Sequence, residues 1–239
     1  MFQIRRANQR GKADFGWLHS QHSFSFGQYY DPQHMGFSSL RVINEDRVLP
    51  SKGFGTHPHS NMEILSFVIS GTLEHKDSMG NGGYIHPNEI QLMSAGKGIT
   101  HSEYNASNSD LVHFLQIWLH PNVTDIEPSY QQQSFEDADR KNTFLELVSP
   151  KNAPQSKGLL QIHQDASIFT SLLEEGKRLS RDLVRSRKYW IQMIDGFLDV
   201  ITSKGMMQLE AGDGLAVADE IVLELEARKQ STFLLFELP

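Results

Sequence analysis

Glycines and short polar clusters interrupt the segment from residue 53 to residue 98, and this spacing limits the length of any regular element between them. They recur at intervals of about eight to twelve residues, which is typical of short strands joined by turns. Between the turns lie β-branched and aromatic runs such as 64–69 and 111–119. No long amphipathic helix is expected before residue 120. The pattern predicts an all-β sandwich or barrel.

A change of composition divides the chain. Residues 121–158 are rich in proline, glutamine and charged side chains, whereas both flanking regions contain apolar runs. We predict an N-terminal domain at 1–120, a connector at 121–158 with one strand at 143–148, and a second all-β domain at 159–239. The segment 166–179 fits both a helical stripe and an alternating strand, so its structure stays open at this point.

Charge and cysteine content exclude several classes of protein. The chain carries 22 basic and 29 acidic residues, for a net charge of -7, which disfavours direct nucleic-acid binding. It has no apolar run long enough to cross a membrane and no apolar N-terminal stretch typical of a secretory signal. With no cysteine, a metal must be held by nitrogen and oxygen ligands. We expect a cytoplasmic protein, and we take it to be a monomer.

Ten of the eleven histidines precede residue 121, and two short motifs stand out among them: His57-Pro58-His59 and His101-Ser102-Glu103. Residues two apart on a strand share one face, so each motif can present two ligands together. On neighbouring antiparallel strands the two pairs could converge. Three imidazoles and one carboxylate suit Fe(II), Mn, Ni, Cu(II) or Zn, and leave a coordination position for another molecule.

Glu63 competes with Glu103 as the carboxylate ligand. On a continuous strand it would lie about 13 Å from His59, but a turn at residues 60–61 could return it to the site. We favour Glu103. The remaining histidines, His75 among them, are expected to be structural or exposed. Phosphate-binding loops, dinucleotide fingerprints and serine-hydrolase elbows are absent from the sequence, so nucleotide and serine-hydrolase chemistry are not expected.

Together these motifs resemble the cupin superfamily, and the pirin family more closely. The resemblance is specific over most of residues 15–120 and looser to the C-terminus. It is carried by Phe24-Ser25-Phe26, Tyr29-Tyr30-Asp31-Pro32, His57-Pro58-His59 with Glu63, His75-Lys76-Asp77-Ser78, and Met93-Ser94-Ala95-Gly96-Lys97-Gly98-Ile99-Thr100-His101-Ser102-Glu103.

The resemblance implies a bicupin, with two antiparallel β-barrels in tandem and one metal in the first. The implied ligands are His57, His59, His101 and Glu103. The second barrel has only one histidine after residue 120 and cannot repeat the site. We expect one divalent transition metal, with iron ranked first and nickel, copper, manganese, cobalt and zinc as alternatives.

Two roles follow from the resemblance. Some bacterial pirins resemble quercetin 2,3-dioxygenases, which open the central ring of a flavonol with O₂ and release carbon monoxide. A planar aromatic molecule and O₂ would then be the substrates, and Glu103 or Glu63 would accept the flavonol proton. Other members look like metal-dependent regulators that act through protein partners. The sequence favours the oxidoreductase, because an open cation site among aromatic side chains accommodates a planar substrate.

Overall fold

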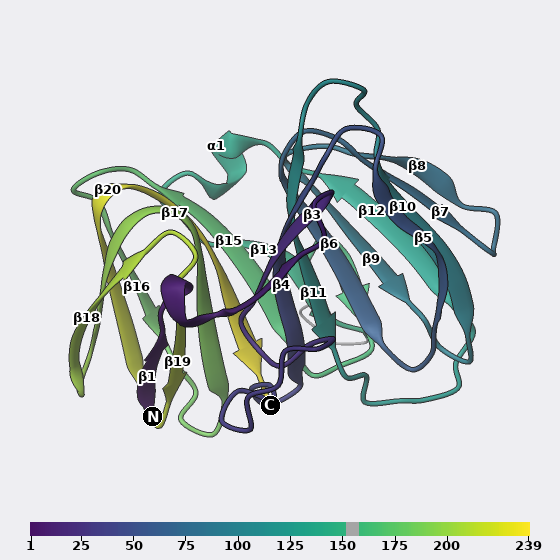
Figure 1. Cartoon of the computed structure of the whole chain (residues 1–239). Helices are drawn as coiled ribbons and strands as arrows, with labels where there is room; N and C mark the ends of the chain where they lie inside the picture. The colour runs from purple at the N-terminus through teal and green to yellow at the C-terminus, as the bar shows by residue number, and fades with distance from the viewer. Residues whose placement is uncertain (152–157) are drawn as a thin grey trace. The chain divides into compact units, whose positions relative to one another are not determined.

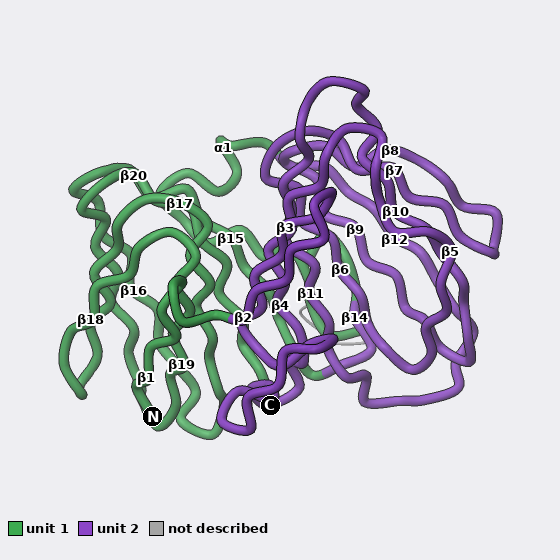
Figure 2. The backbone as a smooth tube through the Cα atoms, in the orientation of Figure 1, with its two compact units in different colours: residues 1–10, 136–161, 165–239 green, residues 11–135, 162–164 purple. Residues whose placement is uncertain are grey.

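The computed structural model describes residues 1–151 and 158–239, which form two compact units (Figures 1 and 2). Unit 2 comprises residues 11–135 and 162–164, and unit 1 comprises residues 1–10, 136–161 and 165–239. Residues 152–157, which belong to the expected connector, lie outside the described residues. Across the described residues, the regular structure consists of antiparallel strands with two very short helices, so the all-β prediction is confirmed.

Unit 2 contains two antiparallel sheets. Their strands are β2 (Gly11–Asp14), β3 (Leu18–His22), β4 (Leu40–Val48), β5 (Gly53–His59), β6 (Glu63–Ser70), β7 (Leu73–Asp77), β8 (Gly82–Ile85), β9 (Glu89–Ser94), β10 (Ile99–Asn105), β11 (Val112–Leu119) and β12 (Ser129–Ser134). One sheet has the order β12-β9-β6-β11-β4-β3-β2, and the other has the order β5-β10-β7-β8.

The space between these sheets is filled unevenly. One apolar cluster joins Val68 and Phe114 of the large sheet to Leu73 and Ile85 of the small sheet. Strand β10 differs, because its buried positions alternate with more exposed ones and include three polar side chains, His101, Glu103 and Asn105. Burying polar groups costs free energy unless they find partners, so this strand is adapted to something other than core packing.

Unit 1 is built on one large sheet. Its elements are β1 (Phe2–Arg5), the 3₁₀ helix η1 (Ala7–Gln9), α1 (Asp137–Arg140), β13 (Leu145–Pro150), β15 (Ser167–Leu173), β16 (Arg178–Asp182), β17 (Lys188–Thr202), β18 (Gly205–Glu210), β19 (Gly214–Ala218) and β20 (Val222–Leu238). The sheet order is β1-β19-β17-β20-β15-β13-β14, where β14 is Leu160–Ile162; β16 pairs with β20 and β18 with β17.

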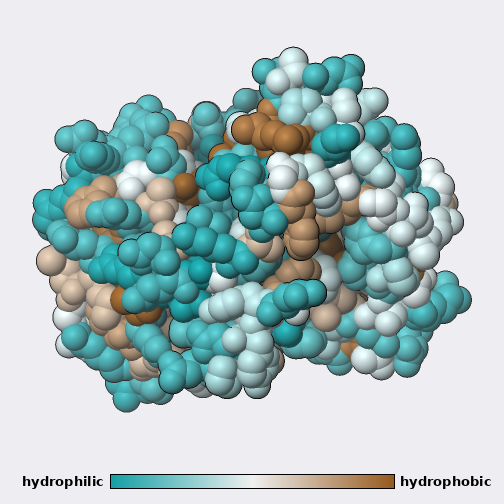
Figure 3. All heavy atoms as spheres, in the orientation of Figure 1, coloured by the Kyte–Doolittle hydropathy of each residue, from teal (hydrophilic) through white to brown (hydrophobic). Residues whose placement is uncertain are grey.

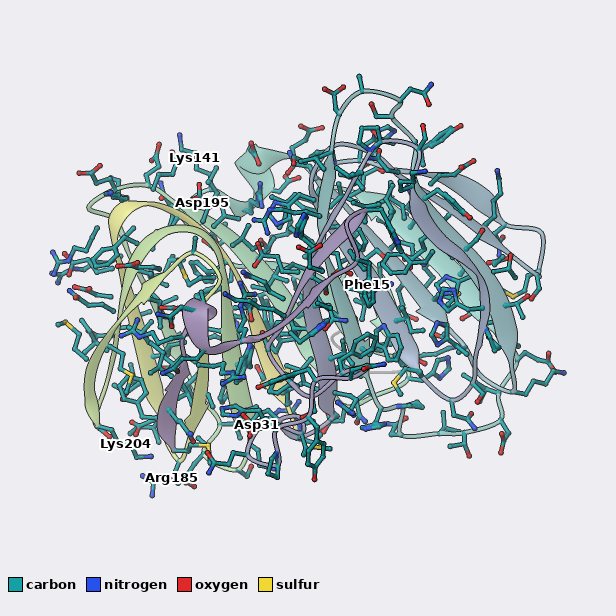
Figure 4. The ribbon with its side chains drawn as sticks, in the orientation of Figure 1. Phe15, Asp31, Lys141, Arg185, Asp195 and Lys204 are labelled. Carbon is teal, nitrogen blue, oxygen red and sulfur yellow. The ribbon has the colours of Figure 1, made fainter. Side chains whose placement is uncertain are left out.

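The long strands β17 and β20 organise unit 1. They pair with each other, and the register shifts around Asp195, which is labelled in Figure 4. The first part of β17 also pairs with β19 and its last part with β18. Their inward residues form one apolar cluster that includes Tyr189, Leu225 and Phe233. This cluster is hydrophobic, in contrast to the polar buried face of β10, although unit 1 also buries polar side chains such as Gln192 and Asp199.

One expectation is wrong, and one segment that the sequence left open can now be assigned. The region 121–158 contains β12 and α1 in addition to β13, so it holds more than one strand. β12 is a polar edge strand that pairs only with β9 in the sheet order, and its Gln-rich composition resembles that of a loop. The open segment 166–179 is a strand, β15, followed by the start of β16. β15 lies between β13 and β20, and pairing on both edges selects the extended form.

The surface agrees with the charged composition. On the face drawn in Figure 3, most exposed side chains are hydrophilic, and the apolar ones form smaller separate areas. Within residues 1–151 and 158–239, no helix has the length and hydrophobicity needed to cross a bilayer.

The turn between β6 and β7 provides a test of this fold. Gly71 adopts a φ of 79°, and a Cβ there would lie 2.5 Å from the carbonyl oxygen of Leu111. We expect Gly71→Ala to lower the free energy of unfolding in urea by about 2 kcal/mol or more. Gly83→Ala is the control, since a Cβ at Gly83 would meet no described atom within 4 Å. Equal destabilisation by both variants would contradict the assigned turn.

Candidate metal centre

The register of the small sheet brings the histidine motifs together. His101 on β10 pairs with His57 on β5 and, across its other edge, with Asp77 on β7. The next inward residue of β10, Glu103, pairs with His75 on β7. A bulge in the β5–β10 pairing lies between these two rows. Both rows face the same side of the sheet because side chains alternate along a strand.

Three imidazoles form the first cluster of candidate ligands. The ring centroids of His57, His59 and His101 are 4.5 to 4.9 Å apart, and one donor atom from each lies within 4.8 Å of the others. His101 is buried, whereas His57 and His59 are partly exposed. The cluster is therefore accessible from the side of β5.

The nitrogen atoms of this cluster fit a cation. Among the described residues, Nε2 of His59 and both ring nitrogens of His101 are buried without a hydrogen-bond partner. Nδ1 of His57 lies 2.8 Å from the carbonyl oxygen of Gly55. A carbonyl only accepts, so in the neutral ring Nδ1 carries the proton and Nε2 keeps its lone pair. A bound ion would compensate for unpaired nitrogens that each cost about 1–3 kcal/mol when buried.

The protonation states agree with this role. Burial, helped by the nearby His57, lowers the pKa of His59 to about 4. Burial and the neighbouring imidazoles lower the pKa of His101 to about 2. At neutral pH both rings are therefore uncharged, which is the form that binds a metal ion.

Glu103 is fully buried and held by two side chains. Nε2 of Gln116 donates to Oε2 at 2.7 Å, and the Ser66 hydroxyl lies 3.0 Å from Oε1 and 2.9 Å from Oε1 of Gln116. Burial raises the pKa of Glu103 to about 7, and the negative charge of Asp46 adds to that effect. Its oxygen belongs to a second cluster with His75 and His101, within 4.8 Å of both donors.

His75 is the member of this region that the sequence analysis assigned a structural role. It is completely buried, and its ring centroid lies 5.3 Å from that of His101. A signal for it was present, because His75 and Asp77 have the same spacing of two as the other motifs. Spacing alone did not reveal that β7 pairs with β10 directly opposite Glu103.

Glu63 lies at the start of β6, after a turn at residues 60–62 in which Asn61 has a φ of 50°. The turn that could return Glu63 to the site is therefore present. Its Oε2 accepts a hydrogen bond of 2.8 Å from the Ser94 hydroxyl. Of the clusters that the described residues form, neither contains Glu63.

Apolar and aromatic side chains border the imidazole cluster. The Trp118 ring packs edge-on against His59 at 4.9 Å and against Phe26 at 5.4 Å. Trp118 also packs on a buried apolar group that includes Met93 and Ile99. An open pocket of about 500 Å³ reaches His59, and its lining consists of Pro58, His59, Ser60, Ser78, Gly98, Ile99 and Thr100.

Imidazoles converging on the inner face of an antiparallel two-sheet unit define the class of cupin-type metal centres. Two family models match the chain: Pirin over residues 3–119 and the quercetinase C-terminal cupin domain over residues 147–238. The chain belongs to the pirin family, as its motifs predicted.

Individual relatives support the assignment to this family. The quercetin 2,3-dioxygenase of Escherichia coli K12 is 43% identical over all of this chain and 99% of its own length. A pirin-like protein of Caulobacter vibrioides is 35% identical over 95% of each chain. The crystal structure of the Escherichia coli pirin YhhW in complex with nickel(II) is 42% identical, with a TM-score of 0.91 and coverage of 100% of this chain and 99% of that one. The bicupin prediction is thereby confirmed.

The hydrogen bonds from Gln116 and Ser66 to Glu103 predict an effect on metal affinity. Gln116→Leu removes the donor to Oε2, and loss of such an orienting contact typically weakens metal binding 10- to 100-fold. The measurement is competition with a chelator for Ni(II), monitored by calorimetry. Gln192→Leu is the control, since Gln192 is a buried glutamine of β17 in unit 1. Unchanged affinity in Gln116→Leu would show that metal binding by Glu103 does not depend on the hydrogen bond from Gln116.

Asp46 predicts a dependence of stability on pH. Burial raises its pKa to about 7 from 3.8, so the folded state favours the protonated form. The protonated carboxyl of Asp46 stabilises the folded state fully below pH about 4, and this stabilisation is lost as the pH rises to about 7. Between pH about 4 and about 7, the free energy of unfolding of the metal-free wild type should fall by at most about 4 kcal/mol relative to that of Asp46→Asn. Urea unfolding measures this difference. A difference that stays constant with pH would refute the assignment.

Proposed function

We propose that this protein is a metal-dependent dioxygenase that opens the ring of a flavonol such as quercetin with O₂. The observation that carries the proposal is the cluster of three imidazoles, partly exposed beside the Trp118 ring, in which nitrogens of His59 and His101 are buried without a partner among the described residues. The name of the Escherichia coli relative supports this substrate class.

His57, His59, His101 and Glu103 are the proposed ligands of one divalent transition metal ion. The donor set accepts most first-row divalent ions, so availability decides which ion is bound. Iron remains the first candidate, and the nickel(II) complex of the related pirin supports nickel as well. When bound, the ion supplies a Lewis acid that favours the deprotonated flavonol and a redox partner for O₂.

Glu103 is the proposed proton acceptor. In the metal-free protein, burial raises the pKa of Glu103 to about 7, so this carboxylate is intrinsically more basic than an exposed one. The Ser66 hydroxyl lies at hydrogen-bond distance from both Glu103 and Gln116. It can turn its single proton toward Oε1 of Gln116, which leaves Oε1 of Glu103 able to carry the proton from the flavonol hydroxyl. Glu63, the alternative acceptor, is instead engaged by Ser94.

Trp118 and Ile99 would orient the substrate and exclude water. Trp118 stands at the edge of His59, so a planar ring that approaches the imidazole cluster meets an aromatic surface. The buried Nε1 of Trp118 has no hydrogen-bond partner within the described residues. It can therefore donate to a polar group of the substrate, while Ile99 lines the open pocket.

Oxygen consumption tests the proposal. The purified protein, reconstituted separately with Fe(II), Ni(II) and Cu(II), should consume O₂ and release carbon monoxide when quercetin is added. Glu103→Gln should lower kcat at least 100-fold, because a general base contributes about that factor or more. Glu63→Gln is the matched control, a second buried carboxylate made neutral, and should keep most of the activity.

Two results would contradict this account. Loss of activity in Glu63→Gln with retention in Glu103→Gln would reverse the assignment of the proton acceptor. Tight metal binding without turnover of any flavonol, under any of the three metals, would reject the dioxygenase and favour a metal-dependent interaction with a protein partner.

A further inference from the structure

We propose that His75 is a further metal-binding residue: His75, His101 and Glu103 form an inner position for the ion, and in an outer position His57 and His59 replace His75 while His101 and Glu103 remain ligands. The inference depends on the metal binding proposed above and extends it beyond the four ligands implied by the motifs.

The strand register creates the two positions. On β10, His101 lies opposite His57 of β5, and Glu103 lies opposite His75 of β7. The donor atoms of His75, His101 and Glu103 all lie within 4.8 Å of one another, as do those of the outer cluster. His101 belongs to both clusters, and each of its ring nitrogens is buried without a partner among the described residues.

The ring of His75 is oriented for this role. Its Nε2 faces Oδ2 of Asp77 at 3.5 Å. Asp77 is itself fixed, because its Oδ1 accepts from the backbone N–H groups of Met79 and Asn81 and its Oδ2 accepts from Nδ2 of Asn81. A carboxylate on one side of an imidazole commonly orients the ring so that its other nitrogen binds a metal.

The other nitrogen, Nδ1 of His75, has no partner in the part of the chain that the structure describes. The side chain is fully buried, with the Tyr130 ring at 5.0 Å and the His101 ring at 5.3 Å. A histidine needed only for packing would leave this nitrogen unpaired at a cost of about 1–3 kcal/mol. An ion between His75, His101 and Glu103 would provide the missing partner.

One ion would use the two positions in turn. Two divalent cations that share one imidazole would repel each other strongly in a buried site. The inner cluster is entirely buried, whereas His57 and His59 of the outer cluster are partly exposed. The inner position would therefore hold the ion away from solvent, and the outer position would present it to a substrate.

Removal of the two outer histidines isolates the inner position. We expect tag-free His57→Ala/His59→Ala protein to bind about one equivalent of Co(II) or Ni(II), with affinity lowered at least tenfold relative to wild type. Equilibrium dialysis with elemental analysis measures the stoichiometry, and the visible Co(II) spectrum reports the ligands. Adding His75→Gln should abolish this binding.

Adding His86→Gln to the double variant is the matched control. It removes the same number of histidines, but His86 is exposed and lies in neither cluster. This triple variant should bind as the double variant does. Circular dichroism checks that each protein is folded. The single variant His75→Gln, with the outer histidines intact, provides a second measurement and should change the Co(II) spectrum.

The outcomes separate the two proposals. The inner position would be overturned if the wild type binds metal but the folded His57→Ala/His59→Ala protein binds none. It would also be overturned if the double variant binds metal equally well after His75→Gln is added. Both results leave the proposed function intact. An unchanged Co(II) spectrum in the single variant would also overturn the inner position. A wild-type protein that binds no metal would reject both.

Discussion

The centre depends on the pairing of β10 with a different partner along each edge. The pairing with β5 contains a bulge, and the pairing with β7 does not shift. The bulge lets His57 lie opposite His101 and Phe54 opposite Glu103, with Gly55 between them supplying the carbonyl that orients His57. A shift of one residue would turn these side chains to the other face of the sheet.

Both units bury polar side chains, but among the described residues only those of unit 2 form clusters of candidate metal ligands. In unit 1, β17 and β20 supply a large apolar cluster, and the buried Asp199 of β17 is paired with Arg228. In unit 2, the buried polar groups include Asp46, His75 and Glu103. Burying such polar groups costs free energy, so their presence in the interior lowers the stability of the metal-free protein. Metal binding would offset part of that cost, which couples the stability of unit 2 to its function.

The sequence predicted those features that depend on one strand at a time. The period of two showed that each histidine motif shares a face, and the turn spacing showed an all-β fold. Of the features that depend on a partner strand, the pairing of the two histidine motifs was expected, whereas others were missed or left open. His75 needed the register of β7, the strand form of residues 167–173 needed β13 and β20, and β12 is so polar that only its pairing with β9 distinguishes it from a loop.

A crystal structure of the Ni(II)-loaded protein, with anomalous diffraction recorded at the nickel edge, tests the central claim most directly. We predict one anomalous peak in unit 2, within about 2.0–2.2 Å of nitrogen atoms of the clustered histidines. A peak at a surface site remote from His101, or none in protein that has bound nickel in solution, would contradict the account.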